Sequence, residues 1–416
     1  MEKYVINGNK KLSGKVRIGS AKNSVLPILA AAILTDEEVI INNCPKIADV
    51  LSMIKILTSI GVDVKFEDEC LILNAKNVCT HEIPSSYAKE LRSSVYMLSA
   101  LISKLKKAKL SYPGGCDIGL RPIDMHLEAF KKLGVNILED NDGLSCCTNQ
   151  TVGQGIYLDF PSVGATENIM IVASLSKGKT EIHNSAKEPE IVDLMKFLNS
   201  MGAKIYGAGT STILIEGVNK LHGTCFTPMF DRIEAGTYLI SAAITGGEIE
   251  ILNCDVKKIS SLVHKLCDNT CKISIRNDII YLKSGESRKS FCFSTGPYPS
   301  FPTDLQAQTV ALLSVSDGVS VSTENIFEMR YRYVPELIKM GADISVKGRN
   351  AIISGVSRLH GATVYAQDLR GGAALVLAGL NAEGVTTVCD IHHIKRGYYN
   401  LDKKLAGLGA DIKITD

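Results

Sequence analysis

The pattern of apolar and polar residues repeats six times along this chain. Each copy has an extended stretch, a helix of small and apolar residues, a strand, an amphipathic helix and a closing turn into further strands. The centre of that closing turn falls at Gly61, Gly134, Gly202, Thr270, Gly341 and Gly409. Successive centres lie about 70 residues apart, and such regularity predicts one supersecondary unit per repeat.

The first helix of each copy is apolar on nearly all sides, as in Glu234–Ala243 and Arg370–Gly379. Such helices are buried on every side, whereas the mixed face of Ile191–Ser200 is typical of a half-exposed second helix. Six β-α-β-α-β-β units grouped three and three predict an α/β protein of two similar lobes, with sheets outside and apolar helices inside. Ligand pockets favour domain interfaces, so we expect the active site in the cleft between the lobes.

Residues that packing does not require, most of them polar, stand at the starts of the buried helices. They are Lys22, Asn23, Arg92, Ser162, Val163, Gly164, Asp304, Asp368 and Arg370. Each one alone fits an exposed surface, but their equivalent positions favour contacts to one anionic ligand. Arginine forks grip a carboxylate or phosphate at two points, and helix N-termini add backbone N–H donors.

The loop Pro113–Asp124 carries the strongest local signal. Its glycines and prolines cannot pack as a core, so we expect Cys116 to be exposed, with Arg121 five residues later. A thiol near a guanidinium is biased toward the reactive thiolate, which indicates a functional role for Cys116.

Composition excludes several classes of function. Net charge is +2 from 46 basic and 44 acidic residues, so no nucleic-acid partner is expected. No long apolar run indicates a membrane span, and twelve cysteines without C-x-x-C pairs fit a reducing compartment. We therefore expect a soluble, cytoplasmic protein. Dispersed cysteines and histidines also argue against a metal site.

Seven segments together resemble one known family over the whole chain: Lys22–Asn23, Pro113–Asp124, Ser162–Asn168, Lys187–Asp193, Asp231–Thr237, Phe301–Gln308 and Asp368–Arg370. The family is the UDP-N-acetylglucosamine 1-carboxyvinyltransferases (MurA), in the EPSP synthase superfamily. The resemblance implies a two-lobed, inside-out α/β barrel. It also implies lobes of residues 21–229, which hold the Cys116 loop, and 1–20 plus 230–416.

The resemblance implies transfer of the enolpyruvyl group of phosphoenolpyruvate to the 3'-hydroxyl of UDP-N-acetylglucosamine, with release of phosphate. This addition and elimination is the first committed step of peptidoglycan synthesis and needs no metal or organic cofactor. Its chemistry requires an acid for the methylene carbon, a base for the hydroxyl and cations for phosphate and carboxylate.

Roles for single residues also follow from the resemblance. Cys116 corresponds to the proton donor and fosfomycin target, and Asp304 to the base, although Asp304 or Thr303 could instead cap the following helix. Lys22, Arg121 and Arg396 correspond to phosphate ligands, with Asn23 beside them, and Arg330 and Arg370 to carboxylate ligands. Contacts to the nucleotide sugar correspond to Asn23, Arg92, Arg121, Pro122, Ile123, Asp124, Met125, Ser162, Val163, Gly164, Asp304 and Ile326.

Two departures from the family pattern concern the surroundings of these residues. Met329 replaces a usual asparagine, and Lys395 replaces a usual aspartate beside Arg396. We expect an altered substrate affinity rather than a different reaction. Two alternatives stay open: a transferase acting on shikimate 3-phosphate, and a non-catalytic paralogue that binds the nucleotide sugar. The oligomeric state does not follow from the sequence.

Overall fold

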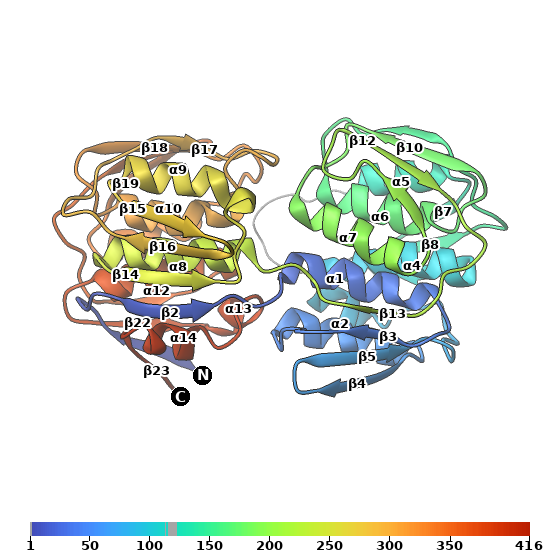
Figure 1. Ribbon diagram of the computed structural model, residues 1–416, viewed down its shortest axis with the longest axis horizontal. Coiled ribbons are helices and arrows are strands. Elements are labelled where there is room, and N and C mark those ends of the chain that lie inside the picture. Colours follow the sequence, from blue (N-terminus) through green and yellow to red (C-terminus); the bar gives the residue numbers. More distant parts are fainter. Residues whose placement is uncertain (1, 113, 115–122) are drawn as a thin grey trace. The chain divides into compact units, whose positions relative to one another are not determined.

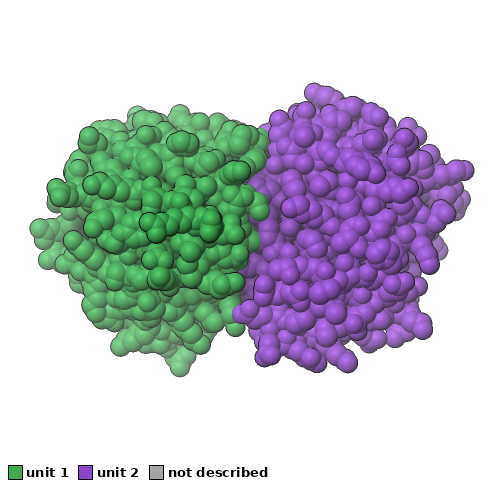
Figure 2. All heavy atoms as spheres, in the orientation of Figure 1, with its two compact units in different colours: residues 1–18, 117–120, 230–416 green, residues 19–116, 121–229 purple. Residues whose placement is uncertain are grey.

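The computed structural model describes residues 2–112, 114 and 123–416, which form two compact units (Figure 2). The first unit contains residues 2–18 and 230–416, and the second contains residues 19–112, 114 and 123–229. The chain therefore enters the second unit after Ile18 and returns to the first after Met229.

Each unit is built around helices (Figure 1). Their side chains are almost entirely buried. In the second unit these are α1 (Lys22–Ala31), α4 (Tyr96–Leu105) and α6 (Val163–Ala173), and in the first α8 (Arg232–Thr245), α10 (Gln306–Leu313) and α12 (Leu369–Asn381). Every residue of α8 and α10 is buried. The absence of a polar face in these sequences is explained by this position, because such a helix has no side toward water.

Small sheets surround the buried helices. The described residues form six of them, of which five are mixed and one is antiparallel. Those of the second unit have the strand orders β13 (Thr224–Phe226), β3 (Val39–Ile41), β5 (Cys70–Asn74), β4 (Asp63–Glu67); β6 (Lys107–Leu110), β8 (Gly143–Cys147), β7 (Asn136–Asp140); and β9 (Gly155–Tyr157), β10 (Lys179–His183), β12 (Thr212–Glu216), β11 (Lys204–Tyr206).

The sheets of the first unit follow the same plan. Their strand orders are β2 (Ser13–Arg17), β14 (Glu248–Leu252), β16 (Ile279–Lys283), β15 (Lys272–Arg276); β17 (Phe293–Ser294), β18 (Val319–Thr323), β20 (Asn350–Ser354), β19 (Asp343–Lys347); and β21 (Thr363–Tyr365), β22 (Val385–Cys389), β1 (Lys3–Asn7), β23 (Asp411–Thr415). In each, the strand that starts the order pairs in parallel with the next, and the remaining pairs are antiparallel.

Two strands, β2 and β13, pair with a sheet that belongs to a repeat distant in the sequence. The strand before α1, β2, pairs in parallel with β14 of the first unit, with Val16 opposite Ile251. Its place in the sheet that contains β3 is taken by β13 from the end of the second unit, with Cys225 opposite Ile40. A repeat counted along the sequence is therefore not one sheet.

The closing turns behave as the repeat predicts. Each follows the second helix of its copy: α2 (Ala48–Ser59), α5 (Asp124–Lys132), α7 (Pro189–Ser200), α9 (Ser260–Asp268), α11 (Val334–Lys339) and α14 (Leu401–Gly407). All six aligned centres, from Gly61 at φ 99° to Gly409 at φ 94°, have a left-handed backbone. Glycine adopts this conformation readily after a helix, and Thr270, at φ 79°, is the exception to the residue type but not to the conformation.

Within the described part of the chain, none of the helices combines the length and the apolar composition that crossing a bilayer requires.

Candidate active site

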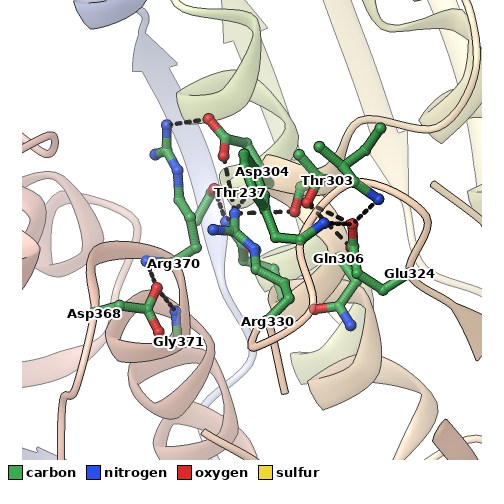
Figure 3. A network of polar contacts seen from close by, with 12 residues as sticks. Thr237, Thr303, Asp304, Gln306, Glu324, Arg330, Asp368, Arg370 and Gly371 are labelled. Carbon is green, nitrogen blue, oxygen red and sulfur yellow. Dashed lines mark hydrogen bonds and ion pairs between the residues drawn. The ribbon is translucent and has the colours of Figure 1, made fainter. Parts of the chain in front are cut away.

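Two buried arginines of the first unit hold the carboxylate of Asp304 between them (Figure 3). Arg330 donates to Oδ1 at 2.8 Å and Arg370 donates to Oδ2 at 2.9 Å. The arginine side chains are 3% and 4% exposed, whereas the Asp304 side chain is 25% exposed. Burial alone would lower the pKa of Arg370, but the Asp304 charge outweighs it and the pKa is raised.

Arg330 is held by the backbone of Thr303, and Thr303 is bonded to Glu324, a carboxylate that carries no signal in the sequence pattern. Its guanidinium also donates to the Thr303 carbonyl at 3.0 Å, and the Thr303 hydroxyl donates to Glu324 at 3.1 Å. Glu324 in turn accepts the backbone N–H groups of Ile326 and Phe327. The turn that carries Arg330 is therefore tied to the segment that carries Asp304.

Arg370 lies over the ring of Tyr398, with 5.4 Å between the guanidinium carbon and the ring centroid. The Tyr398 hydroxyl lies 2.8 Å from the Thr237 hydroxyl, and the Gln308 side-chain amide donates to Tyr398 at 3.1 Å. Thr237, Gln308 and Arg370 come from α8, α10 and α12. The starts of the three buried helices thus meet in one hydrogen-bonded group in this unit.

Helix capping does not explain Asp304. It lies in the 3₁₀ turn Thr303–Leu305, and neither this turn nor α10 has a side-chain cap. The capping alternative is therefore wrong for Asp304 and Thr303. Asp368 does cap α12, because its carboxylate accepts the N–H groups of Arg370 at 2.9 Å and Gly371 at 3.1 Å (Figure 3).

In the second unit, Lys22 begins α1 and its ammonium lies 2.8 Å from the carboxylate of Asp49, in the first turn of α2. The two side chains are 13% and 6% exposed. Asn23 follows Lys22 and is partly exposed, and Ser24 donates to the buried carboxylate of Asp193. Asp49 had no signal of its own in the sequence, because its partner is set by packing of α1 on α2.

A second polar group surrounds His126, in the first turn of α5. Burial, together with the charge of Arg92, lowers the pKa of this histidine to about 4, so the ring is neutral at physiological pH. Gly164 lies so close that a Cβ there would be 2.9 Å from Nε2 of the ring. Arg92 and Gly164 are thus brought together around His126, and the Ser162 hydroxyl caps α6 by accepting from Ala165 N at 3.3 Å.

Glu167 is fully buried in the first turns of α6 and accepts a hydrogen bond from the Tyr96 hydroxyl of α4. Burial raises its pKa well above the usual range, and the nearby charges of Glu190 and Glu188 act in the same direction. The carboxyl group therefore favours its neutral, protonated form.

The remaining described residues of the predicted site range from buried to exposed. Ile123 is buried just before α5, Asp124 begins that helix at the surface, and Met125 is partly exposed. Val163, Ile326 and Arg396 are also partly exposed. Cys116, Arg121 and Pro122 lie outside the described residues.

The two departures from the family pattern have simple surroundings. Lys395 is paired with Glu2 at 2.6 Å, so its charge is balanced within the first unit. Met329 is 44% exposed and needs no polar partner there. Among the described residues, no group of three or more histidine, cysteine, aspartate or glutamate side chains is arranged to hold a metal ion.

Comparison with known proteins identifies the protein family to which this architecture belongs. The sequence model of EPSP synthase (3-phosphoshikimate 1-carboxyvinyltransferase) matches residues 6–405. The crystal structure of the enolpyruvyl transferase NikO from Streptomyces tendae matches with a TM-score of 0.91 at 25% identity, covering 100% of this chain and 99% of NikO. An EPSP synthase structure from Acinetobacter baumannii has a TM-score of 0.78 at 15% identity, with 100% of both chains covered, and shows the shared fold.

A curated relative identifies the group of enzymes within this family. UDP-N-acetylglucosamine 1-carboxyvinyltransferase 2 of Caldanaerobacter subterraneus subsp. tengcongensis is 51% identical over 413 residues, which cover 99% of each chain. The chain therefore belongs to the EPSP synthase family and, within it, to the UDP-N-acetylglucosamine 1-carboxyvinyltransferases. The two-lobed α/β fold class expected from the sequence is confirmed.

Proposed function

We propose that this protein transfers the enolpyruvyl group of phosphoenolpyruvate to the 3'-hydroxyl of UDP-N-acetylglucosamine and releases phosphate, the first committed step of peptidoglycan synthesis. The full-length, 51% identity to a relative named for this transfer carries the proposal. The name of that relative gives UDP-N-acetylglucosamine, and not shikimate 3-phosphate, as the acceptor.

In the first unit, we assign the proton transfer from the sugar hydroxyl to Asp304. Arg330 and Arg370 are proposed to bind the carboxylate of phosphoenolpyruvate, and Arg396 its phosphate. The burial of both carboxylate-binding arginines supports this assignment, because a guanidinium shielded from water binds a carboxylate more strongly. Ile326 is proposed to contact the nucleotide sugar.

In the second unit, Lys22 is proposed to bind the phosphate, with Asn23 near the sugar ring. Arg92, Ile123, Asp124, Met125 and the start of α6 at Ser162, Val163 and Gly164 are proposed to bind the nucleotide sugar. The N-terminus of α6 supports the last contact, because the positive end of a helix dipole favours an anion.

Cys116, Arg121 and Pro122 enter the proposal from the sequence alone. Cys116 would protonate the methylene carbon as the sugar oxygen attacks the neighbouring carbon. Loss of a proton from the resulting methyl group then expels phosphate and restores the double bond. Arg121 and Pro122 would contact the substrates, Arg121 through the phosphate.

Phosphate release tests the reaction directly. Wild-type protein should release phosphate from phosphoenolpyruvate only when UDP-N-acetylglucosamine is present, and shikimate 3-phosphate should not replace it. Release with shikimate 3-phosphate would support the rival transferase. Binding of the nucleotide sugar without any release by folded protein would support the non-catalytic paralogue.

Fosfomycin labelling tests the role of Cys116 separately. The wild-type protein should gain one covalent adduct and lose activity, whereas Cys116→Ser should gain none. Cys116→Asp should keep turnover, because a carboxyl group can still donate a proton, while resisting the label. Labelling of Cys116→Ser at the wild-type rate would contradict the assignment.

A further inference from the structure

The clamp on Asp304 has the composition of a binding site for a carboxylate. Two guanidinium groups, almost fully buried, meet one carboxylate at 2.8 and 2.9 Å (Figure 3). Planar N–H forks of this kind match any carboxylate, whether it belongs to the chain or to a ligand.

The contacts and the exposure of the three side chains in this clamp differ. Arg330 is tied to the Thr303 carbonyl, and Arg370 lies on the Tyr398 ring, whose hydroxyl is bonded to α8 and α10. Asp304 is the most exposed of the three, at 25%, and its carboxylate can turn toward water by rotation of a short side chain. An exchange of partners would therefore move Asp304 and leave both arginines in place.

We propose that Asp304 is an internal competitor of the substrate carboxylate, and that phosphoenolpyruvate displaces it from Arg330 and Arg370. The inference rests on the proposed function and deepens it. A carboxylate paired with two cations is a weak proton acceptor. Displacement releases Asp304 to accept the proton of the sugar hydroxyl, so the base becomes active only when the second substrate is bound.

Binding to a variant without the competing charge tests this exchange. In the full-length protein, Asp304→Asn should abolish turnover but bind phosphoenolpyruvate more tightly, by about tenfold, in titration calorimetry without the nucleotide sugar. A loss of turnover together with a gain in substrate affinity is not expected from structural damage. Inorganic phosphate, which we assign to Lys22 and Arg396, should bind both proteins equally.

Two further variants separate the clamp from general charge. Asp343→Asn removes an equal charge from the exposed strand β19 and should leave the affinity for phosphoenolpyruvate unchanged. In an Arg370→Gln background, Asp304→Asn should no longer tighten binding, because half of the clamp is gone. Unchanged or weaker binding of phosphoenolpyruvate by Asp304→Asn alone overturns the proposal.

A structure of the wild-type protein with phosphoenolpyruvate keeps the test independent of the folding of any variant. The substrate carboxylate should contact Arg330 and Arg370, and the Asp304 oxygens should lie beyond hydrogen-bond distance of both. Asp304 still held by both arginines in that complex would also overturn the exchange. Failure of the proposed function is distinct, since wild-type protein would then release no phosphate at all.

Discussion

The Lys22 ammonium, which begins α1, is paired at 2.8 Å with the Asp49 carboxylate, which lies in the first turn of α2. Both side chains are largely shielded from water. Such a pair orients the lysine and also ties the two helices together. It makes Asp49 a positioning residue for a cation that we assign to phosphate binding.

Removal of the Asp49 charge should affect both stability and substrate binding. Asp49→Asn leaves a shielded lysine without this carboxylate and should cost about 3 kcal/mol in the free energy of unfolding, measured with urea. The KM for phosphoenolpyruvate should rise more than kcat falls, and Asp49→Glu should partly restore it.

The Lys104–Asp36 pair is a matched control, because it has the same 2.8 Å separation while Asp36 is 71% exposed. Asp36→Asn should cost less than 1 kcal/mol, as is usual for exposed ion pairs. Equal losses for the two variants would show that burial does not strengthen the Lys22 pair.

The closing turns predict opposite effects for two neighbouring glycines. Gly409 has φ 94° and Gly407 lies in α14, and an added Cβ would meet nothing within 4 Å at either position. Gly409→Ala should therefore destabilise by about 1 kcal/mol through backbone strain alone. Gly407→Ala should stabilise by up to about 1 kcal/mol, since alanine favours a helix. Thermal unfolding of both variants is the measurement, and the same sign for both would contradict this account.

Tyr398 offers a test of how Arg370 is held. Tyr398→Phe keeps the ring beneath the guanidinium but removes the hydroxyl contacts to Thr237 and Gln308, at a cost of about 1 to 2 kcal/mol of stability. Tyr398→Leu removes the ring as well and should lower kcat/KM for phosphoenolpyruvate further. In an Arg370→Gln background the two variants should have equal kcat/KM, and a persisting difference would mean that Tyr398 acts elsewhere.

His126 predicts a loss of stability in acid. Its pKa is about 4 in the folded chain against about 6.5 when unfolded, so the unfolded chain takes up this proton first as the pH falls. The contribution is complete above pH 6.5 and is lost progressively toward pH 4, by about 3 kcal/mol. His126→Gln should flatten that part of the stability profile, and an unchanged slope would argue against a buried neutral ring.

Glu167 should make the stability of the protein fall as the pH rises, which is the opposite of the effect expected from His126. Its pKa is raised in the folded chain, so the unfolded chain releases this proton first and stability falls as the pH rises above the normal carboxyl range. Glu167→Gln keeps the shape without the charge. Its stability relative to wild type should therefore increase between pH 5 and pH 8, and a constant difference would show that Glu167 ionises normally.

The repeat pattern predicted much of the fold, because the features that it reports are set by residues close together in the sequence. The left-handed turn after each second helix and the apolar composition of helices such as α8 are written in neighbouring residues. The exchange of β2 and β13 was not visible in the pattern, because both strands fit either sheet by their own composition. Their partners β14 and β3 are chosen by the path of the chain between the units.

The residue types at the helix starts predicted contacts to one anionic ligand, and those contacts stay a prediction. The structure brings two of these residues, Asp304 and Arg370, together with Arg330. The residues that support this cluster, such as Glu324 and Tyr398, were missed because they come from distant turns and carry no motif that states their partner. These residues matter because they are buried. A repeating pattern of apolar residues reveals burial in helices and strands, but it does not reveal the burial of single polar residues in turns.

The position of strand β1 implies that the two units complete their folding at different stages of synthesis. It lies between β22 and β23, with Val5 opposite both Thr387 and Lys413, so this sheet joins the beginning of the chain to its end. The described residues of the second unit lie between residues 19 and 229 and can complete their contacts early in synthesis, whereas the sheet around β1 must wait for β23 to leave the ribosome. A truncation at either terminus should therefore damage the same sheet, and a nascent chain stalled before residue 411 should protect the second unit from protease but not the first.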